Sequence, residues 1–373
     1  MNLHVIDGPN FSGRTRRLRE WVGLPNDSTL DPTYNKYAYI GPDVASCFSG
    51  ISPTVTTEIE LSATDRDAAD AAKKAIEDLG FGYCLNQNPF TLSGGEQVVA
   101  AIISATAGRP KRLAIDCALE QLSSDTREKV LTHLKGLDVD LLIADNRTDE
   151  WHFGPTDKMQ SIPGAPVICP NEDLKIIQEP CEIELVDLCH AYIKGRPVLR
   201  NLNLRLLAGE MHQLKGQNGA GKTTLSKILC GLIKPTSGEI RLNGKTVQPW
   251  RKPGTFVSYH FQNPDYQLFT TTVQAQIAQS IQRAHILHWF GLEEHLHAHP
   301  LDLPFVLKKR VALATAINKK SGFLILDEPT LSQDKFTSRH ILQLGSIGGF
   351  IISHSSFIAE LPAIHLEKQG EGG

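Results

Sequence analysis

The segment Gly216–Thr224, with the sequence GQNGAGKTT, constrains the fold of this chain more than any other feature. It matches the pattern G-x-x-x-x-G-K-[ST], follows MHQL as a plausible strand and precedes TLSKILCGLI as a plausible helix. A strand, a glycine-rich turn and a helix in this order predict an α/β fold with a phosphate-binding loop. In such a loop successive backbone N–H groups and the helix dipole face the phosphate oxygens.

The second half of the chain also carries the groups that would hydrolyse a bound nucleotide. We predict nucleotide contacts for Gly216, Asn218, Gly219, Gly221, Lys222, Thr223 and Thr224. Lys222 places a positive charge at the outer phosphates, and the hydroxyl of Thr223 can coordinate Mg²⁺. The apolar run Phe323–Thr330, FLILDEPT, predicts a buried strand that ends in two carboxylates. Asp327 would hold the metal through water, and Glu328 would polarise the attacking water.

In order and spacing, five segments resemble the Walker A, Q-loop, Walker B, D-loop and switch-histidine motifs of ABC ATPases: Gly216–Thr223, Gln262, Phe323–Glu328, Leu331–Asp334 and His354. The resemblance extends from Cys181 to about Leu366. It implies ATP and Mg²⁺ as ligands. It also implies Gln262 as a metal ligand and catalytic group, His354 as a contact of the γ-phosphate, and Tyr192 as the aromatic residue that stacks on adenine.

The signature motif of ABC ATPases, LSGGQ, is absent from the second half. The segment at its place is Leu303–Lys309, LPFVLKK, where a proline replaces the serine and Phe305 and Val306 replace the two glycines. Close approach of the backbone to a phosphate depends on those glycines. We therefore expect this segment not to bind nucleotide.

The first half contains the missing motif as LSGGE, Leu92–Glu96. Leu92 precedes Asp116 by 24 residues, and Leu303 precedes Asp327 by 24 residues, so the two halves align without a gap in this region. In this register we predict that Ser93, Gly94, Gly95 and Glu96 form a signature that contacts nucleotide.

The other motifs of the first half are degenerate. The loop Gly8–Thr15, GPNFSGRT, has Arg14 in place of the lysine, and a forked guanidinium does not replace an ammonium. Cys117 stands where the general base is expected, and a thiol does not replace a carboxylate there. We expect Asp145 at the place of the switch histidine, no Q-loop glutamine in Tyr39–Asp43, and no adenine-stacking segment.

These patterns predict two P-loop domains of the ABC type in tandem, each with a helical signature subdomain. Prolines at five positions mark residues 151–180 as a linker, which leaves 1–150 and 181–373 as the domains. ABC domains pair head to tail, so we expect an intramolecular pair. One composite site would join Lys222 and Glu328 to Ser93, and the second would join degenerate elements on both sides.

Composition limits the partners. The formal net charge of −3 and the absence of a long basic block predict no nucleic-acid partner. No segment reaches the roughly 18 apolar residues that cross a bilayer, and the N-terminus does not resemble a secretory signal. The seven cysteines form no C-x-x-C pair, as is typical of proteins in a reducing cytoplasm.

The segment Phe261–Val273, FQNPDYQLFTTTV, resembles the extended Q-loop of energy-coupling-factor importer ATPases. This resemblance implies a transmembrane coupling subunit, a substrate-capture protein, a micronutrient as cargo, and a location in the cytoplasm on the inner face of the cell membrane. Two alternatives remain open. The chain could drive a conventional ABC importer or exporter, or it could be a soluble ABC protein that acts as a switch on ribosomes or DNA.

Overall fold

The computed structural model describes residues 3–10, 12–23, 37–146, 158–161, 181–217, 219–277, 283–317, 321–342, 348–353, 358 and 361–367. The chain divides into two compact units. Unit 1 comprises Met1–Val167 together with Leu331–Phe336, and unit 2 comprises Ile168–Thr330 together with Thr337–Gly373. The boundary falls within the predicted linker, of which residues 158–161 are described.

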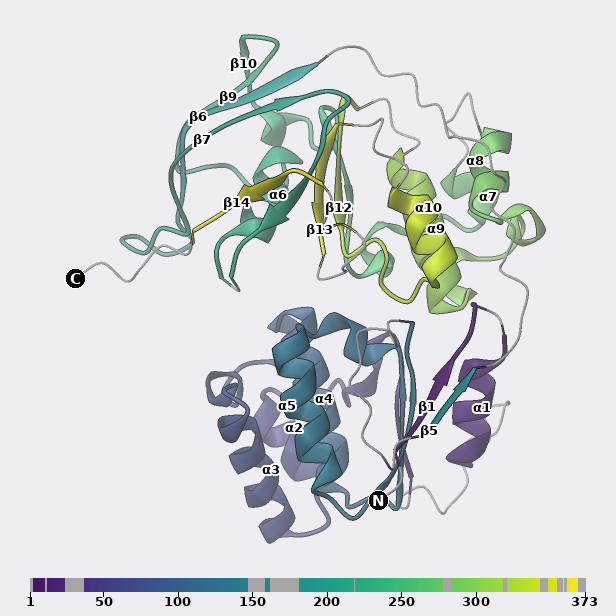
Figure 1. Cartoon of the computed structure of the whole chain (residues 1–373). Helices are drawn as coiled ribbons and strands as arrows, with labels where there is room; N and C mark the ends of the chain where they lie inside the picture. Colours follow the sequence, from purple (N-terminus) through teal and green to yellow (C-terminus); the bar gives the residue numbers. More distant parts are fainter. Residues whose placement is uncertain are drawn as a thin grey trace. The chain divides into compact units, whose positions relative to one another are not determined.

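Unit 1 is built on a parallel five-stranded sheet with the order β2-β3-β4-β1-β5. Figure 1 shows β1 and β5 side by side at one edge of this sheet. The strands are β1 (Leu3–Asp7), β2 (Tyr37–Ile40), β3 (Arg112–Asp116), β4 (Asp140–Ala144) and β5 (Lys158–Ser161). The helices are α1 (Arg14–Trp21), α2 (Val55–Ser62), α3 (Arg66–Asp78), α4 (Gly94–Ala107) and α5 (Ser124–Lys135). Strand β5 is fully exposed and lies inside the segment predicted to be a linker, where its backbone extends the edge of the sheet next to β1.

Alternating side chains of this sheet enter two different cores, as the two-residue period of a strand requires. Ile6, Leu142 and Ala144 pack with Leu18 of α1 on one face. Val5, Leu113, Ile115, Leu141 and Ile143 pack with α2 to α5 on the other face. Helix α3 buries an alanine-rich stripe, and the side chain of Asp65 caps it by accepting a hydrogen bond from Ala68 N at 2.8 Å. The sheet of unit 1 therefore packs against α1 on one face and against α2 to α5 on the other.

Unit 2 contains a second parallel sheet with the order β11-β12-β13-β8-β14, and an antiparallel sheet with the order β10-β9-β6-β7. The strands of the parallel sheet are β8 (Met211–Lys215), β11 (Val257–His260), β12 (Phe323–Asp327), β13 (Gly349–Ile352) and β14 (Ala363–His365). Those of the antiparallel sheet are β6 (Glu182–His190), β7 (Leu199–Leu207), β9 (Ser237–Leu242) and β10 (Lys245–Val247). The helices are α6 (Lys222–Leu229), α7 (Val273–Gln276), α8 (Arg283–Trp289), α9 (Phe305–Ile317) and α10 (Lys335–Leu342).

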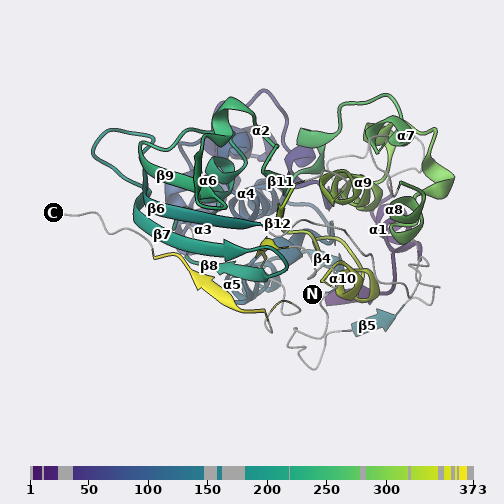
Figure 2. The ribbon, with the colours of Figure 1, turned by 90° about the horizontal axis from the view of Figure 1, so that it is seen from above.

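Helix α6 packs between the parallel and antiparallel sheets of unit 2. Its residues Leu225 and Ile228 share one core with Ile183 and Leu185 of β6 and with Ile325 of β12. Figures 1 and 2 show α6 beside β6 and β9 in two perpendicular views. The opposite face of the parallel sheet packs against α8 and α9. The end of β12 is therefore fixed by packing on both faces.

The two parallel sheets repeat one plan, because β1 and β8, β3 and β12, and β4 and β13 occupy the same positions in the strand order. The glycine before each loop helix has a left-handed backbone, with φ of 91° at Gly13 and 93° at Gly221. The antiparallel sheet of unit 2 has no counterpart among the described residues of unit 1. None of the described helices is long and apolar enough to span a membrane.

Candidate nucleotide site

The loop between β8 and α6 has a shape that requires glycine. A Cβ atom at Gly221 would lie 2.7 Å from Leu199 Cδ2, and the residue has a positive φ. A Cβ atom at Gly216 would lie 2.7 Å from the carbonyl oxygen of Leu366. Both distances are shorter than van der Waals contact, so these two glycines fix the path of the loop. Of the other predicted contacts in this loop, Gly219 is exposed and Asn218 lies outside the described residues.

Lys222 begins α6 and turns back over the loop. Its Nζ donates hydrogen bonds to the carbonyl oxygens of Gly216 at 2.6 Å and Gln217 at 3.3 Å. Burial lowers the pKa of this ammonium, whereas the charges of Asp327 and Glu328 raise it. The ammonium therefore lies within the electrostatic reach of both carboxylates.

Asp327 ends β12 with a side chain that is only 8% exposed. Tyr259 donates its hydroxyl to Asp327 Oδ2 at 2.8 Å. Burial raises the pKa of Asp327 to about 6. The other two predicted oxygen donors are Thr223, which is exposed, and Gln262, which is half-buried. Hard oxygen ligands of this kind fit Mg²⁺, and a bound cation would offset the burial of the carboxylate.

Glu328 follows directly, in a left-handed backbone conformation with φ of 45°. Its N–H donates to the carbonyl oxygen of Ile352 at 2.8 Å, which ties it to the end of β13. Ser353 Oγ donates to Glu328 Oε2 at 2.7 Å. The carboxylate is therefore held by a hydroxyl that sequence reasoning had not singled out. His354, the predicted switch histidine, lies outside the described residues.

Tyr192 lies two residues after β6 and is 60% exposed. Its hydroxyl is 3.2 Å from Thr224 Oγ1, on the first turn of α6. Its ring meets the ring of His190 edge to face at a centroid distance of 4.8 Å. The structure thus brings Tyr192 next to the phosphate-loop helix, with an aromatic face available for stacking.

The predicted signature lies in unit 1, at the start of α4. Ser93 is the exposed N-cap, and its backbone N–H donates to Glu96 Oε2 at 2.7 Å. Tyr83 donates its hydroxyl to Glu96 Oε1 at 2.7 Å. A Cβ atom at Gly95 would lie 3.3 Å from the carbonyl oxygen of Gln121. In unit 2 the corresponding helix α9 begins at Phe305. The bulky residues Phe305 and Val306 stand at the positions of Gly94 and Gly95.

In unit 1 the side chains of the degenerate loop make hydrogen bonds to one another and to neighbouring residues. Arg14 is 6% exposed; its Nη2 donates to Asn10 Oδ1 at 3.2 Å and its Nη1 to the carbonyl oxygen of Asp145 at 3.4 Å. Asp116 Oδ2 accepts hydrogen bonds from Thr15 Oγ1 at 2.6 Å and from Tyr39 at 3.0 Å. Arg14 and Thr15 stand at the positions of Lys222 and Thr223, and both make hydrogen bonds within unit 1.

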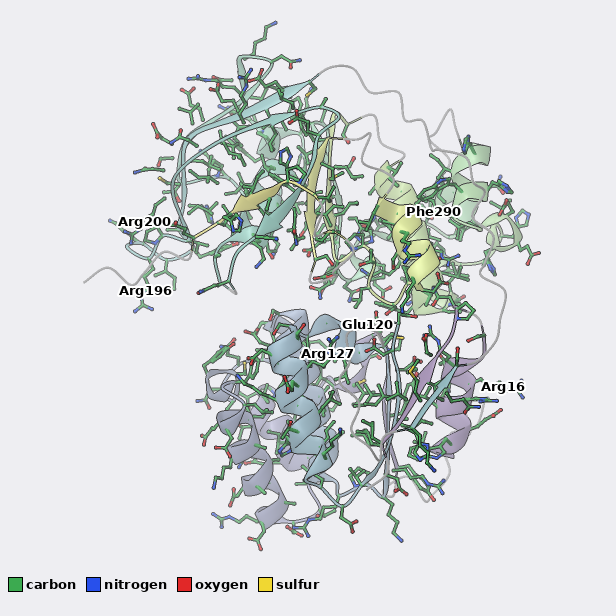
Figure 3. All side chains as sticks on the ribbon, in the orientation of Figure 1. Arg16, Glu120, Arg127, Arg196, Arg200 and Phe290 are labelled. Carbon is green, nitrogen blue, oxygen red and sulfur yellow. The ribbon has the colours of Figure 1, made fainter. Side chains whose placement is uncertain are left out.

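The prediction that Asp145 stands at the place of the switch histidine is wrong by one residue. Asp116 pairs with Ala144 just as Asp327 pairs with Ile352, so Asp145 corresponds to Ser353 and Asn146 to His354. Asn146 Nδ2 donates to Glu120 Oε1 at 2.7 Å and lies 3.6 Å from Cys117 Sγ (Glu120 is labelled in Figure 3). The strand register sets this correspondence, and no sequence motif anchors the residues after β4.

Cys117 shares the left-handed backbone of Glu328, with φ of 55°. Its N–H donates to the carbonyl oxygen of Ala144 at 2.8 Å, which repeats the bond between Glu328 and Ile352. Burial raises the pKa of the Cys117 thiol well above its usual value. A protonated thiol cannot accept a proton from water, so this position offers no general base.

Two residues that sequence reasoning missed belong to the site in unit 2: Tyr259, bonded to Asp327, and Ser353, bonded to Glu328. Tyr259 had a detectable signal, because Tyr39 occupies the same register position in the first half. Ser353 had none besides its place before His354.

Replacing Arg14 by alanine is expected to destabilise unit 1 without reducing ATP turnover. The change leaves Asn10 and Asp145 without a buried guanidinium partner, at a cost of about 1–3 kcal/mol. Urea unfolding should therefore show a lower midpoint, while the turnover per folded molecule stays constant. A loss of turnover at unchanged stability would instead indicate that the first loop binds a functional nucleotide.

Comparison with known proteins relates this chain to ABC transporter ATP-binding proteins. The family model described as "ABC transporter" matches residues 199–331. Two proteins named "Putative ABC transporter ATP-binding protein" are similar: that of Methanosarcina mazei is 27% identical over 91% of this chain and 76% of its own length, and that of Geobacter sulfurreducens is 36% identical over 43% of this chain and 71% of its own length.

The energy-coupling factor transporter ATP-binding protein EcfA of Methanothermobacter thermautotrophicus is 35% identical over 43% of this chain and 57% of its own length. Among solved structures, one titled "RNase-L Inhibitor" superimposes with a TM-score of 0.61 at 15% identity, covering 99% of this chain and 86% of that one. At this identity the similarity shows a shared fold.

Proposed function

Because this chain belongs to the family of ABC transporter ATP-binding proteins and is an ATPase of that type, we propose that it is the motor subunit of an energy-coupling-factor importer with one working ATP site. The observation that carries the proposal is the complementary loss of motifs. Unit 2 retains Lys222, Asp327 and Glu328 but has Pro304 at the signature, whereas unit 1 retains Ser93 but has Arg14 and Cys117 in the catalytic positions.

In the proposed mechanism, the residues of unit 2 bind and orient ATP. Tyr192 stacks on adenine, and Lys222 exchanges the carbonyl oxygens of Gly216 and Gln217 for the outer phosphates. Thr223, Gln262 and Asp327 would hold Mg²⁺, which neutralises phosphate charge when bound. The Tyr259 hydroxyl keeps the Asp327 carboxylate in one orientation.

Glu328 is the proposed general base. Its carboxylate orients a water molecule for in-line attack on the γ-phosphate and accepts a proton from it. Ser353 restricts the rotation of this carboxylate through its hydrogen bond to Oε2. His354 is proposed to donate to the γ-phosphate, and Gln262 to sense the metal and the attacking water.

The signature of unit 1 is proposed to complete this site. The hydroxyl of Ser93 and the N–H groups at the start of α4 can donate to oxygens of the γ-phosphate, where negative charge develops. The alternative pairing would combine Arg14 and Cys117 with Pro304, which removes the lysine, the base and the serine at once. One composite site per chain is the arrangement that these residues support.

Exposed aromatic side chains after Gln262 support a membrane partner. Tyr266 is 63% exposed and Phe269 is 80% exposed, on the segment between β11 and α7. A contiguous patch of exposed large apolar side chains marks an interaction surface, and we propose that Tyr266 and Phe269 belong to one. We assign this surface to a transmembrane coupling subunit that carries a substrate-capture protein, with the ATPase bound peripherally at the inner face of the membrane and a micronutrient as cargo.

Binding to a coupling subunit can be tested with Phe269→Asp. Chain purified from its native membrane should bring an integral membrane subunit with it, and the charged side chain should abolish this association, because burial of an unpaired carboxylate is unfavourable. Mass spectrometry of the purified material is the measurement, and an unchanged melting temperature is the control. Co-purification with ribosomes instead of a membrane subunit would favour the switch alternative.

A further inference from the structure

Lys309 is a fully buried lysine on α9, the helix that begins at the degenerate signature. Its exposed fraction is 0%. Its Nζ donates a hydrogen bond of 2.7 Å to the backbone carbonyl oxygen of Glu328. A buried ammonium is costly unless it has polar partners, so the hydrogen bond to this carbonyl offsets part of the cost of burying Lys309.

The carbonyl that Lys309 contacts belongs to a residue with an uncommon backbone. Glu328 has φ of 45°, a left-handed conformation that residues with a Cβ rarely adopt and that persists when its surroundings hold it. The N–H of Glu328 is tied to Ile352, its carboxylate to Ser353, and its carbonyl to Lys309. Three hydrogen bonds from two elements, the end of β13 and helix α9, thus hold the backbone and the side chain of one residue.

Unit 1 provides an internal comparison. Cys117 has the same left-handed backbone and the same strand tie as Glu328. In the gap-free alignment of α4 with α9, however, Val98 stands at the position of Lys309, and Val98 is a fully buried core residue. The left-handed turn therefore forms in unit 1 with valine at this place, so the lysine is not required by the turn itself. Lysine stands at this position in the repeat that has Glu328 after the strand, and valine stands there in the repeat that has Cys117.

We infer that Lys309 is a positioning residue for the general base and that α9 is kept for this purpose after losing its signature. The ammonium fixes the carbonyl of Glu328 and so sets the direction in which its carboxylate points. Helix α9 then acts within its own unit, on Glu328, whereas its N-terminal segment Leu303–Val306 has lost the ability to bind phosphate. This inference rests on the role proposed above for Glu328.

The test replaces Lys309 by methionine, which keeps the length of the side chain and removes the donor. Because a general base contributes about 10²–10⁴-fold, a misdirected one is expected to lower kcat by about 10- to 100-fold. The affinity for ATP, measured by equilibrium binding, should change by less than about threefold, since the phosphate loop is untouched. Lys309→Gln, which retains an N–H donor, should recover part of the loss.

A second readout does not depend on turnover. Hydrogen exchange of the peptide that contains Glu328 should be faster in nucleotide-free Lys309→Met than in the wild type, because one of the ties to this residue is lost. Val98→Met, at the matched position of α4, is the control and should leave kcat unchanged. Combining Lys309→Met with Glu328→Gln should give no further loss of kcat beyond Glu328→Gln, because both changes act on one group.

The outcomes separate this inference from the proposed function. If Glu328→Gln leaves kcat unchanged, the role proposed for the base is wrong. If Glu328→Gln abolishes turnover while Lys309→Met leaves both kcat and hydrogen exchange unchanged, the positioning role is overturned. A fall in ATP affinity that matches the fall in kcat/KM would also overturn it, because this result would mark Lys309 as part of the general structure of the site.

Discussion

Glu328→Gln is expected to abolish ATP turnover while the protein still binds ATP. The amide keeps the size of the side chain and can still accept from Ser353, but it cannot take a proton from the attacking water. We expect kcat to fall by about 10²–10⁴-fold, the range that general-base catalysis contributes. Phosphate release measures the loss, and equilibrium binding of ATP should show an affinity equal to or higher than that of the wild type.

The matched control for this prediction is Cys117→Ala in the first half. Cys117 has the backbone position of Glu328, and its thiol has a raised pKa, so its removal should leave turnover unchanged. Comparing the two variants shows whether ATP is hydrolysed at only one of the two repeats. Equal losses in both variants would mean that the first loop also hydrolyses ATP, and the single-site proposal would be wrong.

Much of this fold could be predicted from the sequence because it is repeated. The constant separation between Leu92 and Asp116 and between Leu303 and Asp327 fixes the alignment of α4 with α9 and of β3 with β12. The phosphate loop was predictable for a different reason. Gly221 has a left-handed backbone with φ of 93°, a conformation that glycine adopts without steric cost, so the local sequence predicts this turn.

Other parts of the site depend on contacts between residues far apart in the chain. The placement of Asp145 failed because nothing in LLIADN marks the end of β4, which the pairing with Asp116 sets. Arg14 is buried in the first loop, where it donates a hydrogen bond to the carbonyl of Asp145, 131 residues away. The sequence shows that arginine replaces lysine in this loop, but it does not show that the arginine is buried and hydrogen-bonded to Asn10 and Asp145.

The same limit applies to Lys309, which sequence reasoning included in a degenerate signature without assigning it a role. Its neighbours in LPFVLKKR suggest a charged surface of a helix. Burial of Lys309 becomes evident only when α9 is packed beneath the end of β12, where a backbone carbonyl accepts from the ammonium. A position inside a failed motif can therefore keep a function that the motif pattern does not describe.

Ser93→Arg is expected to abolish ATP turnover although Ser93 belongs to the half with the degenerate phosphate loop. The variant removes the hydroxyl and places a long side chain at the N-cap of α4, where the N–H groups are proposed to face the γ-phosphate. Loss of such preorganised donors lowers kcat by about 10²–10³-fold. Phosphate release is the measurement. Binding of ATP to unit 2 should persist, because Lys222 and Tyr192 are unaffected.

Pro304→Arg provides the matched control, because Pro304 is the residue of unit 2 that corresponds to Ser93. If the working site draws its signature from unit 1, the same arginine at Pro304 should leave turnover unchanged, and unchanged melting temperatures in both variants would exclude misfolding as the cause of any loss. Turnover that survives Ser93→Arg but is lost in Pro304→Arg would reverse the assignment. Turnover that survives both would mean that hydrolysis needs no signature, and the first half would then be retained for another purpose than completing an ATP site.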